Sequence, residues 1–354
     1  MTGNSGRHGA GGPDGGHPPA DWGVLAAAAA GAVHARFGHR LMRLPGTWIG
    51  AVASPPAQAP VPWSEWHYWW QAHYLDAVVD AGFRGLRGGN PEAAAQDLAR
   101  GRALLRGIMV RNFGRFPNFY YDDMAWLALA ACRLDQLSRA AAGRPAALAG
   151  LASSTLTAQL HAAHDGVLGG GLYWSRKRDY KNTPVNGPAA LHFARIGEPD
   201  RGRAVADWLR ALLFDDASGL YLDGVHPSGR GPEVERAIYT YNQGPVLAAL
   251  LELDHPRHAG QAAELVAAIE RRLATEGGGL RLEPGADGGL FTGILCRYLA
   301  IAAGDPRLPA PARTTAARLV RDTAGELVGA PEPRMLSAAV QQWTVFEAAA
   351  ALGS

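Results

Sequence analysis

Cysteine and lysine are scarce in this chain of 354 residues. Both cysteines, Cys132 and Cys296, fall in apolar helical segments, where a free thiol behaves as a small hydrophobic side chain. Two cysteines in so long a chain exclude a disulfide framework, although a single bond between them stays open. The two lysines, Lys177 and Lys181, contrast with abundant arginine and alanine, and this bias indicates a GC-rich bacterial genome.

A strong excess of charge is also missing, because the formal net charge is only +2. No cluster of basic residues is interleaved with aromatic ones, so the electrostatic footprint of a nucleic-acid-binding protein is absent. We expect no nucleic-acid partner. With 47% hydrophobic and 19% charged residues, the chain can bury a large core and is typical of a soluble globular protein, which we expect to be a monomer.

No apolar run reaches membrane-spanning length, and no secretory signal is recognisable. Residues 1–20 are rich in Gly, Pro and His without an apolar segment, so we expect a disordered tail there. The alanine run at 26–30 lies far into the chain and lacks a preceding basic region. These features predict a cytoplasmic protein with a single folded domain over residues 21–354, and export by a less obvious route stays open.

Signatures of nucleotide and metal sites are missing too. No Gly-rich phosphate loop follows a strand. His67 and His73 are six residues apart, so they do not share one face of a helix. Asp215 and Asp216 lie among Gly and Ser and fit a turn, and the alternative is a calcium loop formed by Asp215, Asp216 and Asp223. We therefore expect no metal and no cofactor.

Helical patterns of two kinds alternate along the chain. Segments rich in alanine and arginine have one polar face, whereas the segments between them are apolar nearly all round. The first kind belongs outside a fold and the second inside it. The outer segments are 22–38, 92–110, 145–163, 200–214, 258–274 and 310–326. The inner segments are 65–82, 122–138, 184–197, 240–253, 290–303 and 335–350. This alternation predicts an all-α (α/α)6 barrel with a few short strands in loops, and an irregular helical domain or a solenoid is the alternative.

In such a barrel the inner helices begin at one end, and unusual side chains gather at these starts. Amides, carboxylates and flat aromatic rings suit a pocket that holds sugar hydroxyls and stacks on pyranose rings. The candidate substrate-binding residues are Trp70, Gln71, Tyr121, Trp126, Tyr173, Asn182, Asn186, Tyr239, Tyr241, Asn242, Gln243, Phe291 and Trp343. Trp69 and Trp70 are adjacent and cannot both face the pocket, and Trp126 has core filling as its alternative role.

The adjacent carboxylates Asp122 and Asp123 open the second inner helix among aromatic residues. Helix capping is the simpler explanation, but one cap needs only one aspartate. Glycoside cleavage commonly needs two carboxyl groups, and retaining enzymes hold them about 5 to 5.5 Å apart. Neighbouring residues at a helix start can approach that separation, so the pair favours retention. Mutual repulsion should keep one of the two protonated near neutral pH, as a general acid requires.

Five sequence blocks resemble glycoside hydrolase family 76, the endo-α-1,6-mannanases. They occur in the family's order over roughly residues 64–350 and read "WWQA", "YYDDMAWLALA", "KNTPVNG", "YTYNQGPVLAALLEL" and "DGGLFTGILCRYL". The resemblance implies an (α/α)6 fold and retaining hydrolysis of α-1,6-linked mannan or manno-oligosaccharides without a metal. By the family's pattern, Asp122 would be the nucleophile and Asp123 the general acid/base. Thr292 departs from this pattern, because the family's block has lysine there.

Three alternatives to this hydrolase remain at the level of the sequence. The chain could transfer mannan to an acceptor other than water. It could be another sugar-active enzyme with the same fold, such as an epimerase or an unsaturated-uronyl hydrolase. It could also bind a glycan without cleaving it, although the intact aspartate pair argues against that. The sequence leaves endo or exo action open, because loop lengths decide whether the groove is open at its ends.

Overall fold

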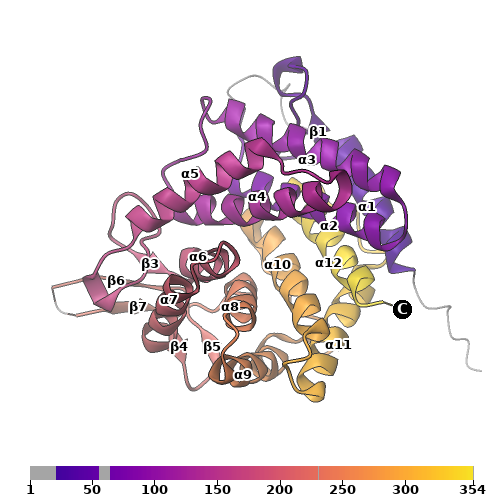
Figure 1. The fold of residues 1–354 in the computed structure, drawn as a ribbon. Helices are drawn as coiled ribbons and strands as arrows, with labels where there is room; N and C mark the ends of the chain where they lie inside the picture. The colour runs from indigo at the N-terminus through magenta and orange to yellow at the C-terminus, as the bar shows by residue number, and fades with distance from the viewer. Residues whose placement is uncertain (1–20, 56–63, 230, 354) are drawn as a thin grey trace, which may run out of the picture.

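The computed structural model describes residues 21–55, 64–229 and 231–353, and twelve α-helices lie within them (Figure 1). The expected tail at residues 1–20 lies outside the described residues. The inner helices are α2 (Tyr68–Arg87), α4 (Tyr121–Ala142), α6 (Thr183–Arg195), α8 (Thr240–Glu252), α10 (Gly285–Gly304) and α12 (Leu336–Ala351). The outer helices are α1 (Trp22–Arg36), α3 (Pro91–Arg111), α5 (Ala147–Ala163), α7 (Pro199–Leu212), α9 (Pro256–Leu273) and α11 (Ala310–Leu327).

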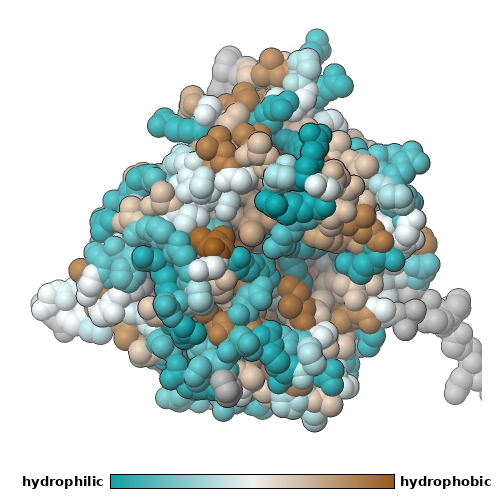
Figure 2. Space-filling model, viewed as in Figure 1, coloured by the Kyte–Doolittle hydropathy of each residue, from teal (hydrophilic) through white to brown (hydrophobic). Residues whose placement is uncertain are grey.

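The inner helices form a closed ring. Each contacts the next inner helix in the chain, and α12 contacts α2 to complete the circle. Every outer helix packs against at least one neighbouring inner helix, as α3 does on α2 and α5 on α4. The predicted (α/α)6 barrel is thereby confirmed, with the apolar segments inside and the arginine-rich ones outside. On the face shown in Figure 2, hydrophobic residues form small areas separated by hydrophilic ones.

Strands are short and confined to the loops. The largest sheet is antiparallel, with the order β3 (Lys181–Asn182), β6 (Gly224–His226) and β7 (Glu233–Glu235), and it pairs Lys181 with Val225 and Val225 with Val234. Two further pairs are β1 (Gly38–His39) with β2 (Ile49–Gly50), and β4 (Phe214–Asp215) with β5 (Leu220–Tyr221). Because β3 leads directly into α6, the largest sheet lies at the end of the barrel where the inner helices begin.

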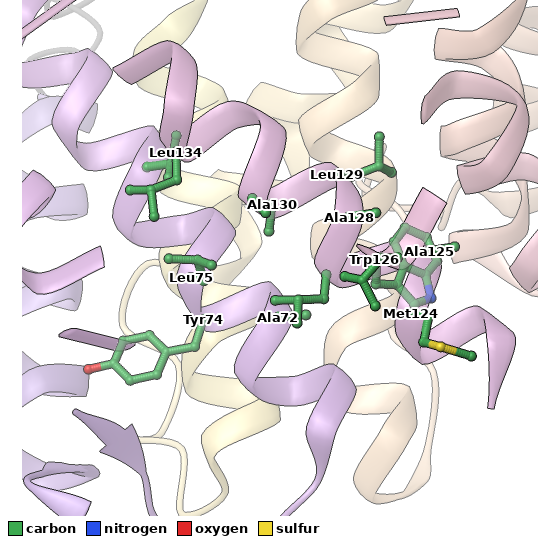
Figure 3. Close-up of a cluster of buried hydrophobic side chains, with 14 of the residues drawn as sticks. Ala72, Tyr74, Leu75, Met124, Ala125, Trp126, Ala128, Leu129, Ala130 and Leu134 are labelled. Atoms are coloured by element: carbon green, nitrogen blue, oxygen red, sulfur yellow. The ribbon is translucent and has the colours of Figure 1, made fainter. Parts of the chain in front are cut away.

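The core between α2 and α4 combines small and branched side chains (Figure 3). Leu75 of α2 and Leu134 of α4 are fully buried and lie side by side, both next to Gly101 of α3. Ala72 and Ala128 are buried in the same core cluster. Burying such side chains contributes about 25 cal/mol per Å² of apolar surface, so the ring itself holds much of the stability.

Gly107 of α3 marks a tight contact with the segment before β2. A Cβ atom added there would lie 1.9 Å from the backbone oxygen of Trp48, which cannot move aside as a side chain would. We expect Gly107→Ala to lower the free energy of unfolding by about 1–3 kcal/mol or more, measured by urea denaturation. Gly150→Ala is the matched control: no atom lies within 4 Å of its added Cβ, so alanine should stabilise α5 by about 0.5–1 kcal/mol. Equal effects at both sites would contradict the packing argument.

Helix α10 corrects one expectation from the sequence. Among the described residues it is the one helix long and apolar enough to cross a membrane, with a mean hydropathy of 1.2, so the statement that no run reaches this length is wrong. In the structure, 61% of that apolar window is buried, and α10 packs against α8, α11 and α12. Its hydrophobicity is that of an inner helix covered on several sides. Cys296 of α10 is buried and, like Cys132, is a free thiol.

Candidate active site

A cavity of about 850 Å³ opens at the end of the barrel where the inner helices start. First-turn residues of several inner helices line it: Trp69 of α2, Asp122 and Asp123 of α4, Tyr241 of α8 and Asp287 of α10. The loops and strands at this end supply the remaining wall, which includes Asn118, Phe119, Tyr120, Trp174, Tyr180, Asn182 and Asp223. The fold therefore brings polar and aromatic residues far apart in the sequence to one place.

Asp122 and Asp123 project into this cavity from different hydrogen-bond surroundings. Asp122 accepts two hydrogen bonds, from the indole Nε1–H of Trp174 at 2.8 Å and from the backbone N–H of Asp123 at 2.9 Å. Asp123 accepts one from the side-chain amide of Asn118. The helix cap is Tyr120, which makes no side-chain cap bond, so neither aspartate is the N-cap residue. Two donors on Asp122 against one on Asp123 favour the ionised form at Asp122.

Burial governs the protonation of both carboxyl groups. It raises the pKa of Asp122 to about 7, although the hydrogen bonds from Asp123 and Trp174 act in the opposite direction. Burial, and next the neighbouring charge of Asp122, raise the pKa of Asp123 well above its usual range. Two carboxyl groups this close cannot both ionise easily, so the pair holds one proton near neutral pH. As pH rises past about 7, the pKa of Asp122, the site therefore takes the form with one carboxylic acid and one carboxylate.

Aromatic rings form the wall beside the pair. Tyr241 stacks on Phe291 with ring centroids 3.8 Å apart, and both residues line the cavity. Trp126 lies 6.4 Å from Tyr241, and Trp69 lies 6.1 Å from Phe291, again between ring centroids. Trp126 also lines the cavity, although it is only 4% exposed. Its ring therefore forms part of the cavity wall and also packs in the core beneath it. Such flat surfaces suit the apolar face of a pyranose ring.

Two further carboxylates of the cavity wall accept hydrogen bonds from neighbouring side chains. Asp287 accepts hydrogen bonds from the indoles of Trp69 and Trp70, at 3.2 and 2.8 Å. Asp223 accepts one from the Tyr180 hydroxyl at 2.7 Å and one from the Asn242 amide at 3.1 Å. Burial raises the pKa of Asp223 as well.

Six of the predicted site residues line the cavity. They are Asp122, Asp123, Trp126, Asn182, Tyr241 and Phe291. Asn182 is 3% exposed, and its buried Oδ1 atom lacks a hydrogen-bond partner within the described residues.

The other nine predicted residues do not line the cavity: eight are buried behind its wall or deeper in the barrel, and Tyr239 is half-buried beside Phe291. They are Trp70, Gln71, Tyr121, Tyr173, Asn186, Tyr239, Asn242, Gln243 and Trp343. Trp70 and Asn242 reach the wall indirectly, through their bonds to Asp287 and Asp223. Trp343 is two turns into α12, or about 10 Å along the helix, and its indole donates to Glu347 at 2.9 Å. Of the two adjacent tryptophans, Trp69 lines the cavity and Trp70 packs.

Three of these amides share a different task, which is to anchor loops. Gln71 bonds both the backbone N–H and the C=O of Gly50, at 2.8 and 2.9 Å. Asn186 does the same at Leu172, and Gln243 at Tyr221. Each amide thus satisfies both polar groups of one loop residue, which would otherwise be buried without partners. The sequence does not distinguish a loop-anchoring amide from a ligand-binding one, because each is an Asn or Gln near the start of an inner helix.

Sequence reasoning missed several wall residues, above all Trp174, Tyr180 and Asp223. Trp174 and Tyr180 come from loops whose course the sequence does not reveal, and Asp223 was assigned to a turn. Asp287 was recognisable, since it stands in the first turn of an inner helix as Asp122 does.

The residues considered for metal binding do not converge. Within the described ranges, no group of three or more His, Cys, Asp and Glu side chains is arranged to hold a metal ion. Asp215 accepts from the backbone N–H of Ser218 at 2.9 Å and pairs with Arg236, whereas Asp223 faces the cavity. His67 stacks near Trp70, and His73 packs against Trp126 with ring centroids 4.7 Å apart.

Comparisons with known proteins agree with this geometry. The α-1,6-mannanase GH76A of Salegentibacter sp. HEL1_6 has a similar structure, with 26% identity and a TM-score of 0.80 over 94% of this chain and 100% of that one. An inactive variant of the same enzyme, with two consecutive aspartates changed to asparagine, is in complex with α-1,6-mannotriose; it has 25% identity and a TM-score of 0.81 over the same shares. The Lin0763 protein of Listeria innocua shares the fold at 23% identity, with a TM-score of 0.77 over 94% and 97% of the two chains.

No curated protein sequence matches the chain. A family model does match it: residues 43–305 fit the model described as "Glycosyl hydrolase family 76", and this range is most of the chain. The range contains the aspartate pair and the residues that line the cavity around it. The chain therefore belongs to glycosyl hydrolase family 76 and is a glycoside hydrolase.

Proposed function

We propose that the protein is a retaining hydrolase of α-1,6-mannosidic linkages in mannan or manno-oligosaccharides. The observation that carries this proposal is the pair Asp122 and Asp123, two adjacent carboxyl groups with unequal hydrogen bonding in one cavity. The substrate is inferred from the related mannanase, whose complexes contain α-1,6-mannotriose and α-1,6-mannotetrose. The replacement of two consecutive aspartates in its inactive variants supports the same pair here.

In the first step, Asp123 donates its proton to the glycosidic oxygen while the Asp122 carboxylate attacks the anomeric carbon. The bond between that carbon and the leaving sugar breaks, and a mannosyl ester of Asp122 forms. In the second step, Asp123 removes a proton from water, the water oxygen attacks the anomeric carbon, and Asp122 leaves as a carboxylate. Two inversions give net retention, and both aspartates return to their starting states.

The cavity supports the binding of a neutral glycan. Its wall carries several carboxylates, which accept hydrogen bonds from hydroxyl groups and would repel an acidic sugar. This charge pattern argues against an unsaturated uronic acid as the substrate. The rings of Trp126, Tyr241 and Phe291 offer stacking surfaces beside these acceptors.

Product analysis with linear α-1,6-mannotetraose, and with the α-1,2 and α-1,3 isomers, tests linkage specificity. We expect the purified protein to shorten the α-1,6 isomer and to leave the other two intact. Products longer than the substrate would show transfer to a sugar acceptor in place of water. If all three isomers stayed unchanged at high enzyme concentration, the proposal would be refuted.

The pH dependence of kcat/KM follows from the shared proton. The pair is active with one proton, so activity should rise as the first proton leaves and fall as the second leaves. The pH profile of kcat/KM thus has an acid limb, where activity rises, and an alkaline limb, where it falls. Because the pKa values of both groups are raised, both limbs should lie at higher pH than for ordinary carboxyl groups, with appreciable activity at neutral pH. A profile with its optimum near pH 4 would contradict this assignment.

Asn118→Ala should move only the alkaline limb. The amide of Asn118 donates to Asp123 and lowers the pKa of that carboxyl group. Its loss removes this stabilisation of the ionised form, so the alkaline limb of kcat/KM should shift upward while the acid limb stays in place. A downward shift would contradict the assignment of Asp123 as the group that must be protonated.

A further inference from the structure

We propose that Trp174 is the positioning residue that keeps Asp122, rather than Asp123, ionised at the start of the reaction. This inference rests on the proposed function, because it explains how two adjacent aspartates acquire different roles. Both are in the first turn of the same helix and line the same cavity, so their position alone does not distinguish them.

The distinguishing contact is the indole of Trp174. Its Nε1–H donates to Oδ2 of Asp122 at 2.8 Å. An indole N–H can only donate a hydrogen bond. It therefore pairs with a carboxylate oxygen, but not with a carboxyl O–H that points at it. The other oxygen of Asp122 accepts from the backbone N–H of Asp123. Both oxygens of Asp122 thus meet N–H donors, an arrangement that stabilises the anion.

The backbone holds Trp174 firmly in place. Its N–H donates to the carbonyl oxygen of Tyr180 at 2.8 Å, and its own carbonyl oxygen accepts from the N–H of Tyr121 at 2.7 Å. The second bond ties Trp174 to the residue directly before Asp122. A change in the position of this loop would therefore move donor and acceptor together.

Lys181 anchors the same loop from behind. Its ammonium group is fully buried and donates three hydrogen bonds of 2.7–2.8 Å, to the Asp165 carboxylate and to the carbonyl oxygens of Val167 and Gly170. The neighbouring residue Tyr173 forms a β-bridge with Lys181. One of the two lysines of the chain thus fixes the loop that carries Trp174.

Other ionisable groups surround Asp122 in the cavity and have to be considered in any titration. The carboxyl groups are Asp123, Asp179, Asp223, Glu235 and Asp287. The remaining ones are His67, Tyr68, Tyr120, Lys177, Tyr180, His226 and Tyr241. Burial and the neighbouring charge of Asp223 both favour a proton on Asp122, which makes a specific donor to Asp122 necessary. Trp174 is the side chain that the structure shows donating to it.

Trp174→Phe removes the N–H and keeps an aromatic ring. A hydrogen bond to a charged group of this kind corresponds to about a ten- to hundredfold preference for the ionised form. We expect kcat to fall by about that factor and the acid limb of kcat/KM to move upward by about one to two pH units. A role in packing alone would lower kcat without moving the limb.

Trp69→Phe is the matched control, because it removes an indole N–H that points to Asp287 and not to Asp122. Trp69→Phe can change KM, but the acid limb of its kcat/KM profile should lie at the same pH as in the wild type. If Trp174→Phe left the limb unchanged, or if Trp69→Phe moved it equally, the proposal would be wrong.

A titration that does not depend on activity separates this proposal from the proposed function. The aspartate carboxyl ¹³C resonances can be followed by NMR, with Asp122 assigned by its loss in Asp122→Asn. In Trp174→Phe the midpoint of Asp122 should move upward toward that of Asp123. An unchanged midpoint overturns the role of Trp174, even in an enzyme that cleaves α-1,6-mannan. A shifted midpoint in a protein without mannanase activity supports the role and refutes only the proposed substrate.

Discussion

Asp122→Gly should reduce hydrolysis of α-1,6-mannotetraose by about 10³-fold or more, with an unchanged circular dichroism spectrum. The carboxylate that attacks the anomeric carbon is lost, and no other side chain is placed in the first turn of α4 to replace it, since Asp123 holds the proton. Asp123→Gly should lose a similar factor with natural substrates, because their leaving sugar needs protonation.

Azide distinguishes the two aspartates, because it can enter the space that either truncation leaves. With a dinitrophenyl α-mannobioside, Asp122→Gly should release dinitrophenolate and form the β-mannobiosyl azide, since the anion attacks in a single inversion. Asp123→Gly should form the α-mannobiosyl azide, because the mannobiosyl ester of Asp122 forms first and is then displaced by azide. The opposite pattern would exchange the two roles. Full activity in either variant without azide would remove that residue from the mechanism.

Arg297→Met should destabilise the barrel by about 3–5 kcal/mol. Arg297 of α10 is 5% exposed and bonds Asp76 at 3.1 Å and Asp80 at 2.7 Å, both on α2. Arg133 of α4 pairs with the same two aspartates. Helices α2 and α10 are not neighbours in the ring, so these ion pairs connect inner helices that do not pack side by side. Without Arg297, the buried carboxylate of Asp76 and the partly buried one of Asp80 would share the guanidinium of Arg133, and urea denaturation should show the loss.

The control for this prediction is Arg318→Met. Arg318 pairs with Glu270 and Asp322 but is 42% exposed, so solvent screens its charge and its loss should cost under about 1 kcal/mol. The pH dependence of stability gives a second check. Burial alone would raise the pKa of Asp76, but Arg133 and Arg297 bring it below the usual value, so this part of the stability should be lost as pH falls. An equal loss of unfolding free energy in Arg297→Met and Arg318→Met would contradict a stabilising role for the buried ion pairs of Arg297.

The fold was largely predictable, because hydrophobic pattern alone separates inner from outer helices. One boundary was predicted less well, at the glycines that precede residue 290. The fifth inner helix was expected at 290–303, but α10 begins at Gly285. A Cβ atom at Gly289 would lie 2.7 Å from the Ser337 side chain, and one at Gly293 would lie 3.0 Å from Gln341 of α12. These glycines allow two helices to pack closely, a reason that only tertiary structure reveals.

The kinds of side chain in the site could be predicted from the sequence, but the individual residues that line the cavity could be predicted only in part. The aspartate pair could be singled out because adjacent carboxylates among aromatics need an explanation. The amides could not be sorted, since Gln71 and Asn186 have the same environment in the sequence as Asn182. Loop residues such as Trp174 were missed because a loop carries no periodicity to place its side chains. The expected monomer, the single domain over residues 21–354 and the cytoplasmic location stay predictions.

The anomeric configuration of the first product tests the central claim most directly. Wild-type protein is mixed with α-1,6-mannotetraose in an NMR tube, and the anomeric protons are recorded before mutarotation equilibrates them. Retention through Asp122 and Asp123 predicts that the new reducing end appears first as the α-anomer and then relaxes toward the equilibrium mixture. Initial appearance of the β-anomer would mean a single displacement by water, and the assignment of Asp122 as nucleophile would be wrong.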